Sequence, residues 1–236
     1  MSSQRSEAGA VQRSGVRIPV WAWFTLWMLV WVGIPMLLHY AVHGVVNGWQ
    51  FTIAFFLAIN LNICIWEICL VIRNRDITYW NTDPAGRAVR PPSGIFLQRK
   101  SLREMATTQP WAQIWSEYVY YDPSYADPRS YGFWGDVSNG FSTLLPSIFF
   151  LLGMTVPIVS PAVLGIVGVM MFWQKAYCTS VYLITYLFHR RWVGRPLGWV
   201  MLAVGVSNAV WIVFPLIGVY ACIRLILENR FDLFWN

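Results

Sequence analysis

Charged residues are scarce in this chain. Asp, Glu, Lys and Arg make up 12% of its 236 residues, whereas apolar types make up 57%. A soluble domain carries about twice that share of charge, so the composition excludes an ordinary soluble fold. The net charge of +6 does not indicate a nucleic-acid partner, because the basic residues lie in the tail and in loops between apolar runs, where they orient membrane proteins.

Histidine and cysteine are also few, with three and four copies. The cysteines lie inside apolar runs without the spacing of a zinc site, which is typical of thiols that pack as small hydrophobic groups. They are Cys64, Cys69, Cys178 and Cys222. His39 and His43 are four residues apart, but no third ligand accompanies them. We therefore expect neither a metal nor another cofactor.

Long apolar runs are the main feature of the sequence. About 20 predominantly apolar residues span a bilayer, and five runs qualify: 18–46, 51–72, 133–159, 162–188 and 197–227. The sequence thus predicts an all-α, integral membrane bundle of five transmembrane helices. We expect residues 18–236 to form this single domain, after a cytoplasmic tail at 1–17.

The arginines predict the orientation of the bundle. They gather in the tail, in the loop 73–132 and in the turn after residue 188, which alternate with turns that hold none. Such alternation places the N-terminus and the loop in the cytoplasm. We expect a multi-pass protein of the endoplasmic reticulum in a eukaryote or of the inner membrane in a bacterium. In the loop, residues 95–105 are predicted to form an amphipathic helix, and 111–125 an aromatic belt or a lid.

Three ionisable residues lie inside the predicted spans: Glu67, Asp136 and Lys175. Such groups are costly in a membrane and mark a function or a buried pair. At helical spacing each of the last four spans carries one polar or aromatic stripe. The stripes consist of Asn60, Cys64 and Glu67; of Asp136, Asn139 and Thr143; of Lys175, Thr179 and Tyr182; and of Asn208, Trp211 and Pro215. Packed together, they would line a single internal cavity.

Each of these residues also has a simpler interpretation. Glu67 lies roughly a turn and a half from the cytoplasmic end of its span and would then have a surface role. Asp136 would serve as a helix cap if the third span began there. Lys175 would only neutralise Glu67 or extend its amine to the membrane surface. Trp211 is one of 15 tryptophans and would then be a packing residue.

Three segments of the second half resemble a known family. Trp115-Ser116-Glu117-Tyr118 is followed by Asp122, residues 185–190 end a predicted span with His-Arg, and residues 207–215 contain Asn208-Ala209-x-Trp211-x-x-x-Pro215. In this order the segments resemble the emopamil-binding protein (EXPERA) family, which includes a sterol double-bond isomerase. The resemblance implies a five-helix membrane fold.

The resemblance also implies residue roles. In the isomerase, carboxylates inside the membrane handle protons and a tryptophan faces a cationic intermediate. Glu67, Asp136 and Trp211 are therefore the expected catalytic residues, and Asn208 is the expected orienting residue in substrate binding. His39 and His43 are similar to the family's H-x-x-x-E pattern, with His in place of Glu. The other expected substrate-binding residues are Asn60, Asn139, Thr143, Lys175, Thr179 and Tyr182.

Three functions are consistent with these residues. The leading hypothesis is an intramembrane isomerase that moves a double bond in a sterol or related polycyclic isoprenoid through a carbocation. Residues 62–67 also resemble the Trp-Glu helix of membrane-bound terpene cyclases, which use the same acid chemistry. A non-catalytic protein that binds sterols or other amphiphiles is the third. In each case the expected partners are an isoprenoid lipid and the bilayer, and a homodimer is left open.

Overall fold

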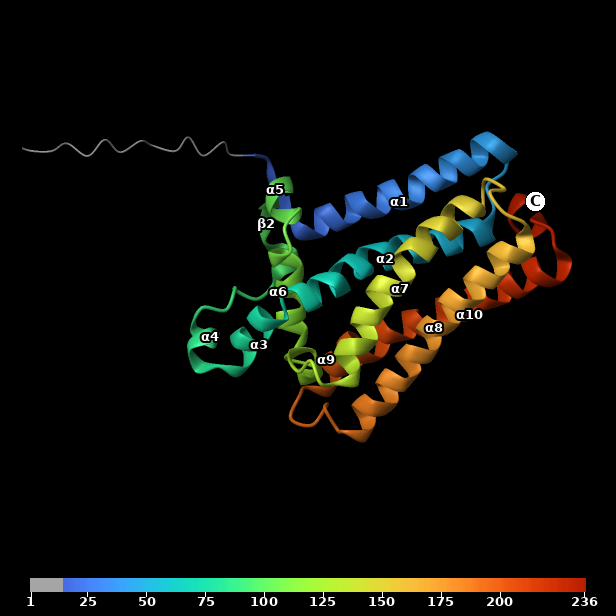
Figure 1. The fold of residues 1–236 in the computed structure, drawn as a ribbon. Helices are drawn as coiled ribbons and strands as arrows, with labels where there is room; N and C mark the ends of the chain where they lie inside the picture. The colour runs from blue at the N-terminus through green and yellow to red at the C-terminus, as the bar shows by residue number, and fades with distance from the viewer. Residues whose placement is uncertain (1–14) are drawn as a thin grey trace, which may run out of the picture.

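A computed structural model describes residues 15–236 of the chain. Its long helices are α1 (Val20–His43), α2 (Gly48–Ile72), α7 (Tyr131–Gly153) and α8 (Pro161–Phe188), followed by a last rod made of α9 (Leu197–Val200), a π-helical turn η3 (Met201–Val206) and α10 (Ser207–Glu228). Figure 1 shows these rods side by side, with α1 at the edge of the bundle. The predicted tail 1–17 lies almost entirely outside the described residues.

Within residues 15–236, four helical rods are long and apolar enough to cross a membrane: α1, α2, α8 and the rod Leu197–Glu228. This supports a multi-pass membrane protein with an all-α bundle. The expected span at 133–159 forms α7, which packs among the others but does not reach the same apolarity because of its serines, threonine, asparagine and aspartate. The count of five spans therefore stays a prediction.

Helix α1 is loosely attached to the rest. Only Val20 and His39 are buried along its 24 residues. Large apolar side chains such as Leu29 and Leu37 are 66% and 71% exposed. A surface of this kind is suited to lipid, which is as apolar as a protein core.

Glycines bring the inner helices close together. A Cβ atom on Gly140 of α7 would lie 2.9 Å from Glu67 Cβ and 3.0 Å from the Cys64 carbonyl oxygen on α2. Helices α8 and α10 approach each other in the same way, because a Cβ on Gly165 would lie 2.7 Å from the Cys222 carbonyl oxygen. Small residues at such crossings let backbones pack closely in membranes.

The loop 73–132 folds into short elements at one end of the bundle. They are α3 (Asn74–Thr82), α4 (Pro84–Ala88), η1 (Ile95–Leu97), α5 (Leu102–Met105), α6 (Gln109–Tyr118) and η2 (Pro123–Ala126). Figure 1 shows α6 crossing the ends of the long helices. The last helix, α11 (Asp232–Trp235), lies at the opposite end of the bundle.

The predicted amphipathic helix at 95–105 is wrong. Strand β2 (Arg99–Ser101) interrupts it and pairs antiparallel with β1 (Arg17–Pro19). Ser101 then caps the four-residue helix α5 through a capping box with Glu104. The backbone groups of 99–101 are thus satisfied by a distant strand rather than by a helix, which local periodicity cannot reveal.

We expect Gly165→Ala to lower the stability of the bundle. The new methyl group would force α8 and α10 apart, and overpacking of this kind costs about 1–3 kcal/mol. Gly33→Ala is the matched control, since no atom lies within 4 Å of its Cβ position in α1. Thermal unfolding in detergent should show a lower midpoint for Gly165→Ala only, and equal midpoints would contradict the close approach of the two helices.

Candidate functional site

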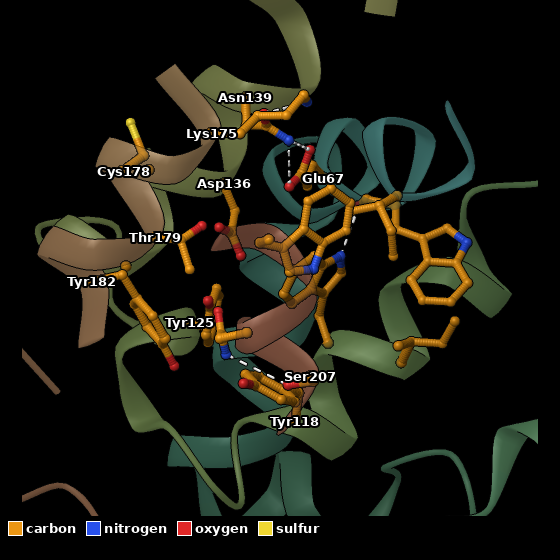
Figure 2. Close-up of a pocket in the computed structure, with 18 of the residues that line it drawn as sticks. Glu67, Tyr118, Tyr125, Asp136, Asn139, Lys175, Cys178, Thr179, Tyr182 and Ser207 are labelled. Carbon is orange, nitrogen blue, oxygen red and sulfur yellow. Dashed lines mark hydrogen bonds between the residues drawn. The ribbon is translucent and has the colours of Figure 1, made fainter. Parts of the chain in front are cut away.

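One cavity of about 210 Å³ lies where the inner helices meet α6. Residues from α2, α6, η2, α7, α8 and the last rod line it. Most of the predicted site residues are among them: Glu67, Asp136, Asn139, Lys175, Thr179, Tyr182, Asn208 and Trp211. Figure 2 shows Glu67, Asp136 and Lys175 around this space. The polar stripes of four helices therefore converge, as the helical spacing predicts.

A chain of hydrogen bonds connects Lys175 to Glu67 through Asn139. Lys175 Nζ donates to Asn139 Oδ1 at 3.0 Å, and Asn139 Nδ2 donates to Glu67 Oε1 and Oε2 at 2.9 and 2.7 Å. The three residues are only 2%, 8% and 3% exposed. The ammonium and the carboxylate are thus joined by an amide rather than by direct contact (Figure 2).

The chemistry of lysine fixes this arrangement. An ammonium group has three donors and no acceptor, so the oxygen of the Asn139 amide must face Lys175 and its NH2 group must face Glu67. The other two ammonium donors reach Asn60 Oδ1 at 2.5 Å and Thr143 Oγ1 at 2.8 Å. All three donors are therefore used, which is the condition under which a buried charge is tolerated.

Asn60 and Thr143 lie behind the cavity rather than on its surface. Asn60 Nδ2 donates to Ser147 Oγ at 2.8 Å, and Ser147 Oγ donates to the Thr143 carbonyl at 2.7 Å. Asn60 and Thr143, both predicted to bind substrate, thus serve as hydrogen-bond acceptors for Lys175. Ser147 was not predicted, although its position four residues after Thr143 extends the same stripe of α7.

Asp136 occupies a different position from Glu67. Its half-buried side chain lines the cavity and points into it (Figure 2). It is not the helix cap, since α7 begins at Tyr131 and Ser130 Oγ accepts from the Phe133 amide. Within residues 15–236 its carboxylate has no ion-pair partner within 4.0 Å. Two carboxyl groups therefore share the cavity, and only Glu67 is linked to a cation.

Trp211 and Asn208 enter the cavity from the last rod. Lys175 Nζ lies 5.8 Å from the centroid of the Trp211 ring, close enough for a cation–π contact. Asn208 Nδ2 donates to the Val204 carbonyl at 2.7 Å, inside the π-helical turn η3. Turns of this type recur at functional sites, and this one follows from no pattern in the sequence.

Aromatic side chains close the cavity at the loop end. The Trp115 indole donates to the Trp66 carbonyl at 2.7 Å, and its ring lies 4.9 Å from that of Tyr125. Trp115 and Tyr125 are buried, so 111–125 forms a lid on the bundle rather than an exposed belt. Burial raises the pKa of Tyr118 and Tyr125, which keeps both phenols neutral.

The Tyr182 hydroxyl also belongs to this wall. It is buried and has no hydrogen-bond partner in residues 15–236. A buried hydroxyl without a hydrogen bond is costly. The Tyr182 hydroxyl would therefore gain from a hydrogen bond to a polar group of a bound ligand. The sequence singled out Tyr182 by its spacing from Lys175 and placed Trp115 in a predicted belt or lid, but it did not indicate that Trp115 would bind Trp66 of α2.

The structure places His39 and His43 outside the cavity. His39 Nε2 lies 2.9 Å from the Phe234 carbonyl oxygen, and the His43 ring stacks on Trp235 with centroids 4.5 Å apart. Both therefore hold the C-terminal helix α11, at the end of the bundle away from α6 (Figure 1). No group of three possible metal ligands is found in residues 15–236.

Comparisons with known protein families, with curated proteins and with solved structures found no match. The function of the chain is therefore inferred from the geometry of the cavity.

Lys175→Met and Glu67→Gln should each destabilise the protein, and the double variant should recover part of the loss. Either single change leaves one buried charge uncompensated, which costs about 3–5 kcal/mol. The double change removes both charges, so we expect a coupling of about 1–3 kcal/mol in a double-mutant cycle. Thermal unfolding in detergent measures it, with Lys100→Met as the control for removing a lysine outside the network. Additive effects of the two changes would show that the amide does not join the charges.

Proposed function

We propose that this protein is an intramembrane isomerase that moves a carbon–carbon double bond in a sterol or related polycyclic isoprenoid. One observation carries the proposal: Glu67, Asp136 and Trp211 line the same cavity inside a bundle of apolar helices. Protonation of an alkene needs an acid shielded from water, deprotonation needs a second group, and the cation between these steps favours an aromatic face.

The charges of the cavity support an acid and a base at the same time. Lys175 supplies one positive charge, and two carboxyl groups face the same space. Two carboxylates close to one cation are disfavoured in a low-dielectric interior, so one of them retains its proton. An unequal pair of this kind is the usual arrangement for acid–base catalysis.

The hydrogen bonds support Glu67 as the base. It is the carboxyl group joined to Lys175 through Asn139, so the ammonium stabilises its ionised form. Asp136 has no such link and would hold the proton. In the proposed reaction, Asp136 gives its proton to one alkene carbon, and the resulting carbocation loses a proton from a neighbouring carbon to Glu67. The double bond has then moved, and proton exchange with water restores both groups.

The aromatic wall would stabilise the cation between these steps. A desolvated cation–π contact contributes about 2 kcal/mol or more, and Trp211, Trp115 and Tyr125 each present a ring to the cavity. The charge of Lys175 near Trp211 is balanced by Glu67, which limits its repulsion of a carbocation. Because Tyr125 stays neutral, its phenol does not capture the cation as a phenolate would.

The size of the cavity supports a particular placement of the substrate. Its volume of about 210 Å³ is smaller than the roughly 300–1,000 Å³ typical of complete small-molecule sites. We therefore propose that only the reacting ring enters, while the rest of the hydrocarbon skeleton lies between the helices and the bilayer.

The test is turnover of a panel of sterols and polycyclic isoprenoid alkenes in D2O. We expect a product with an unchanged ring count, a shifted double bond and one deuterium. Glu67→Gln and Asp136→Asn should each lower the rate about 10²–10⁴-fold, as for loss of an acid or a base. Trp211→Ala should lower it about 30-fold, which corresponds to 2 kcal/mol of transition-state stabilisation.

Asp76→Asn is the matched control, because this carboxylate pairs with Arg73 in the loop, away from the cavity. It should keep the wild-type rate. Full turnover by both Glu67→Gln and Trp211→Ala would exclude the proposed chemistry.

A terpene cyclase is the second candidate. The observation that favours it is the number of rings around the two acids, since Trp66, Trp115, Tyr118, Tyr125 and Trp211 all line the cavity. Such a wall can stabilise a cation at several positions, as a cyclisation requires. A product with more rings than the substrate would favour the cyclase, and saturable binding without any product would favour a non-catalytic sterol-binding protein.

A further inference from the structure

A second cavity lies at the loop end of the bundle, outside the site described above. Its volume is about 480 Å³. It lies between two segments, one formed by the end of α4 and the residues after it, the other by the end of α6 and the residues after it. The residues that matter here are Arg87, Arg90, Ser93, Glu117, Tyr120 and Tyr121.

The two arginines of this cavity are held in place by backbone carbonyls. Arg87 Nε donates to the Asn81 carbonyl at 3.2 Å, and Arg90 Nη2 donates to the Ser116 carbonyl at 2.8 Å. Each guanidinium has five donors, so most of them remain free. Neither guanidinium forms an ion pair within residues 15–236.

The charge of the cavity is positive. Its one acidic residue, Glu117, already accepts hydrogen bonds from the Ile95 amide at 3.0 Å and from Gln113 Nε2 at 3.5 Å. A third cation lies at the rim, because the Arg195 guanidinium stacks on Tyr120 at 4.5 Å from its ring centroid. The cavity thus offers many donors and one occupied acceptor, as anion sites do.

The cavity lies level with the end of a long helix. The Tyr186 hydroxyl, near the C-terminal end of α8, donates to the Tyr121 carbonyl at 3.2 Å. The next residue, Asp122, pairs with Arg191 at 3.3 Å, just beyond that helix. Tyrosine and arginine concentrate at this depth because lipid headgroups lie there.

From this geometry we propose that the cavity binds the phosphate group of an anionic phospholipid. The guanidinium groups of Arg87 and Arg90 would bind its oxygens, since their planar forks fit phosphate. Hydroxyl groups of Ser93 and Tyr120 add further donors. This site is separate from the carboxylate cavity and does not depend on the reaction proposed for it.

The test compares lipid retention by the 236-residue chain and its variants. Protein reconstituted in phosphatidylcholine with a fraction of phosphatidylglycerol is extracted into detergent, and native mass spectrometry counts the bound lipids. We expect wild type to retain phosphatidylglycerol over phosphatidylcholine. Arg87→Gln, which removes an exposed side chain, should weaken that retention about tenfold, and Arg87→Gln/Arg90→Gln should abolish it. Unfolding midpoints confirm that both variants are folded.

Arg103→Gln is the matched control, because it removes the same charge from an exposed position of the same loop outside the cavity. It should retain the lipid as wild type does. Equal loss in Arg103→Gln and Arg87→Gln would show general surface attraction and overturn the proposal. Inorganic phosphate is the second arm: if millimolar phosphate displaces phosphatidylglycerol completely, the site is one for soluble phosphate, and the lipid assignment fails.

Discussion

A lysine ammonium buried among four apolar helices imposes a strict demand on its neighbours. Lys175 has to find three acceptors and a compensating charge without help from water. It obtains the acceptors from Asn60 on α2 and from Asn139 and Thr143 on α7. The charge comes from Glu67, one amide further on. The positions of three helices are thereby tied to a single ammonium group.

This network also gives the cavity its chemical asymmetry. Glu67 lies at the end of a chain of donors, whereas Asp136 faces the cavity without such support. An apolar bundle with one carboxyl group would bind a hydrocarbon but would have no means of both adding and removing a proton. The proposed isomerase activity follows from the pair. The aromatic lid of α6 and η2 completes the shielding from water that such chemistry requires.

Much of the carboxylate cavity could be predicted from helical spacing. Residues three, four or seven apart on a span share a face, so Glu67, Asp136, Lys175 and Trp211 were expected to converge. The bridging role of Asn139 could not be predicted, because it depends on how closely Gly140 lets α7 approach α2. The distance between two helices is set by tertiary packing, and the periodicity of residues within one helix does not predict it.

Other elements differed from expectation for similar reasons. Residues Arg99–Ser101 pair with the distant strand Arg17–Pro19, and no local pattern indicates that partner. His39 and His43 have the spacing of a ligand pair, yet they serve α11 at the other end of the bundle. The lid and the arginine cavity come from the long loop, where aromatic and basic residues were recognised as interfacial but their partners were not.

Infrared spectroscopy of the purified protein can identify the carboxyl group that holds the proton, since a protonated carboxyl group has a C=O stretch distinct from that of a carboxylate. Labelling only the aspartate or only the glutamate carboxyl carbons with a heavy isotope leaves both groups of the cavity in place. We expect one band from a buried protonated carboxyl group, which shifts when the aspartates are labelled and stays in place when the glutamates are labelled. A band that shifts only with glutamate labelling would contradict the assignment, because the lysine would then not hold Glu67 in its ionised form.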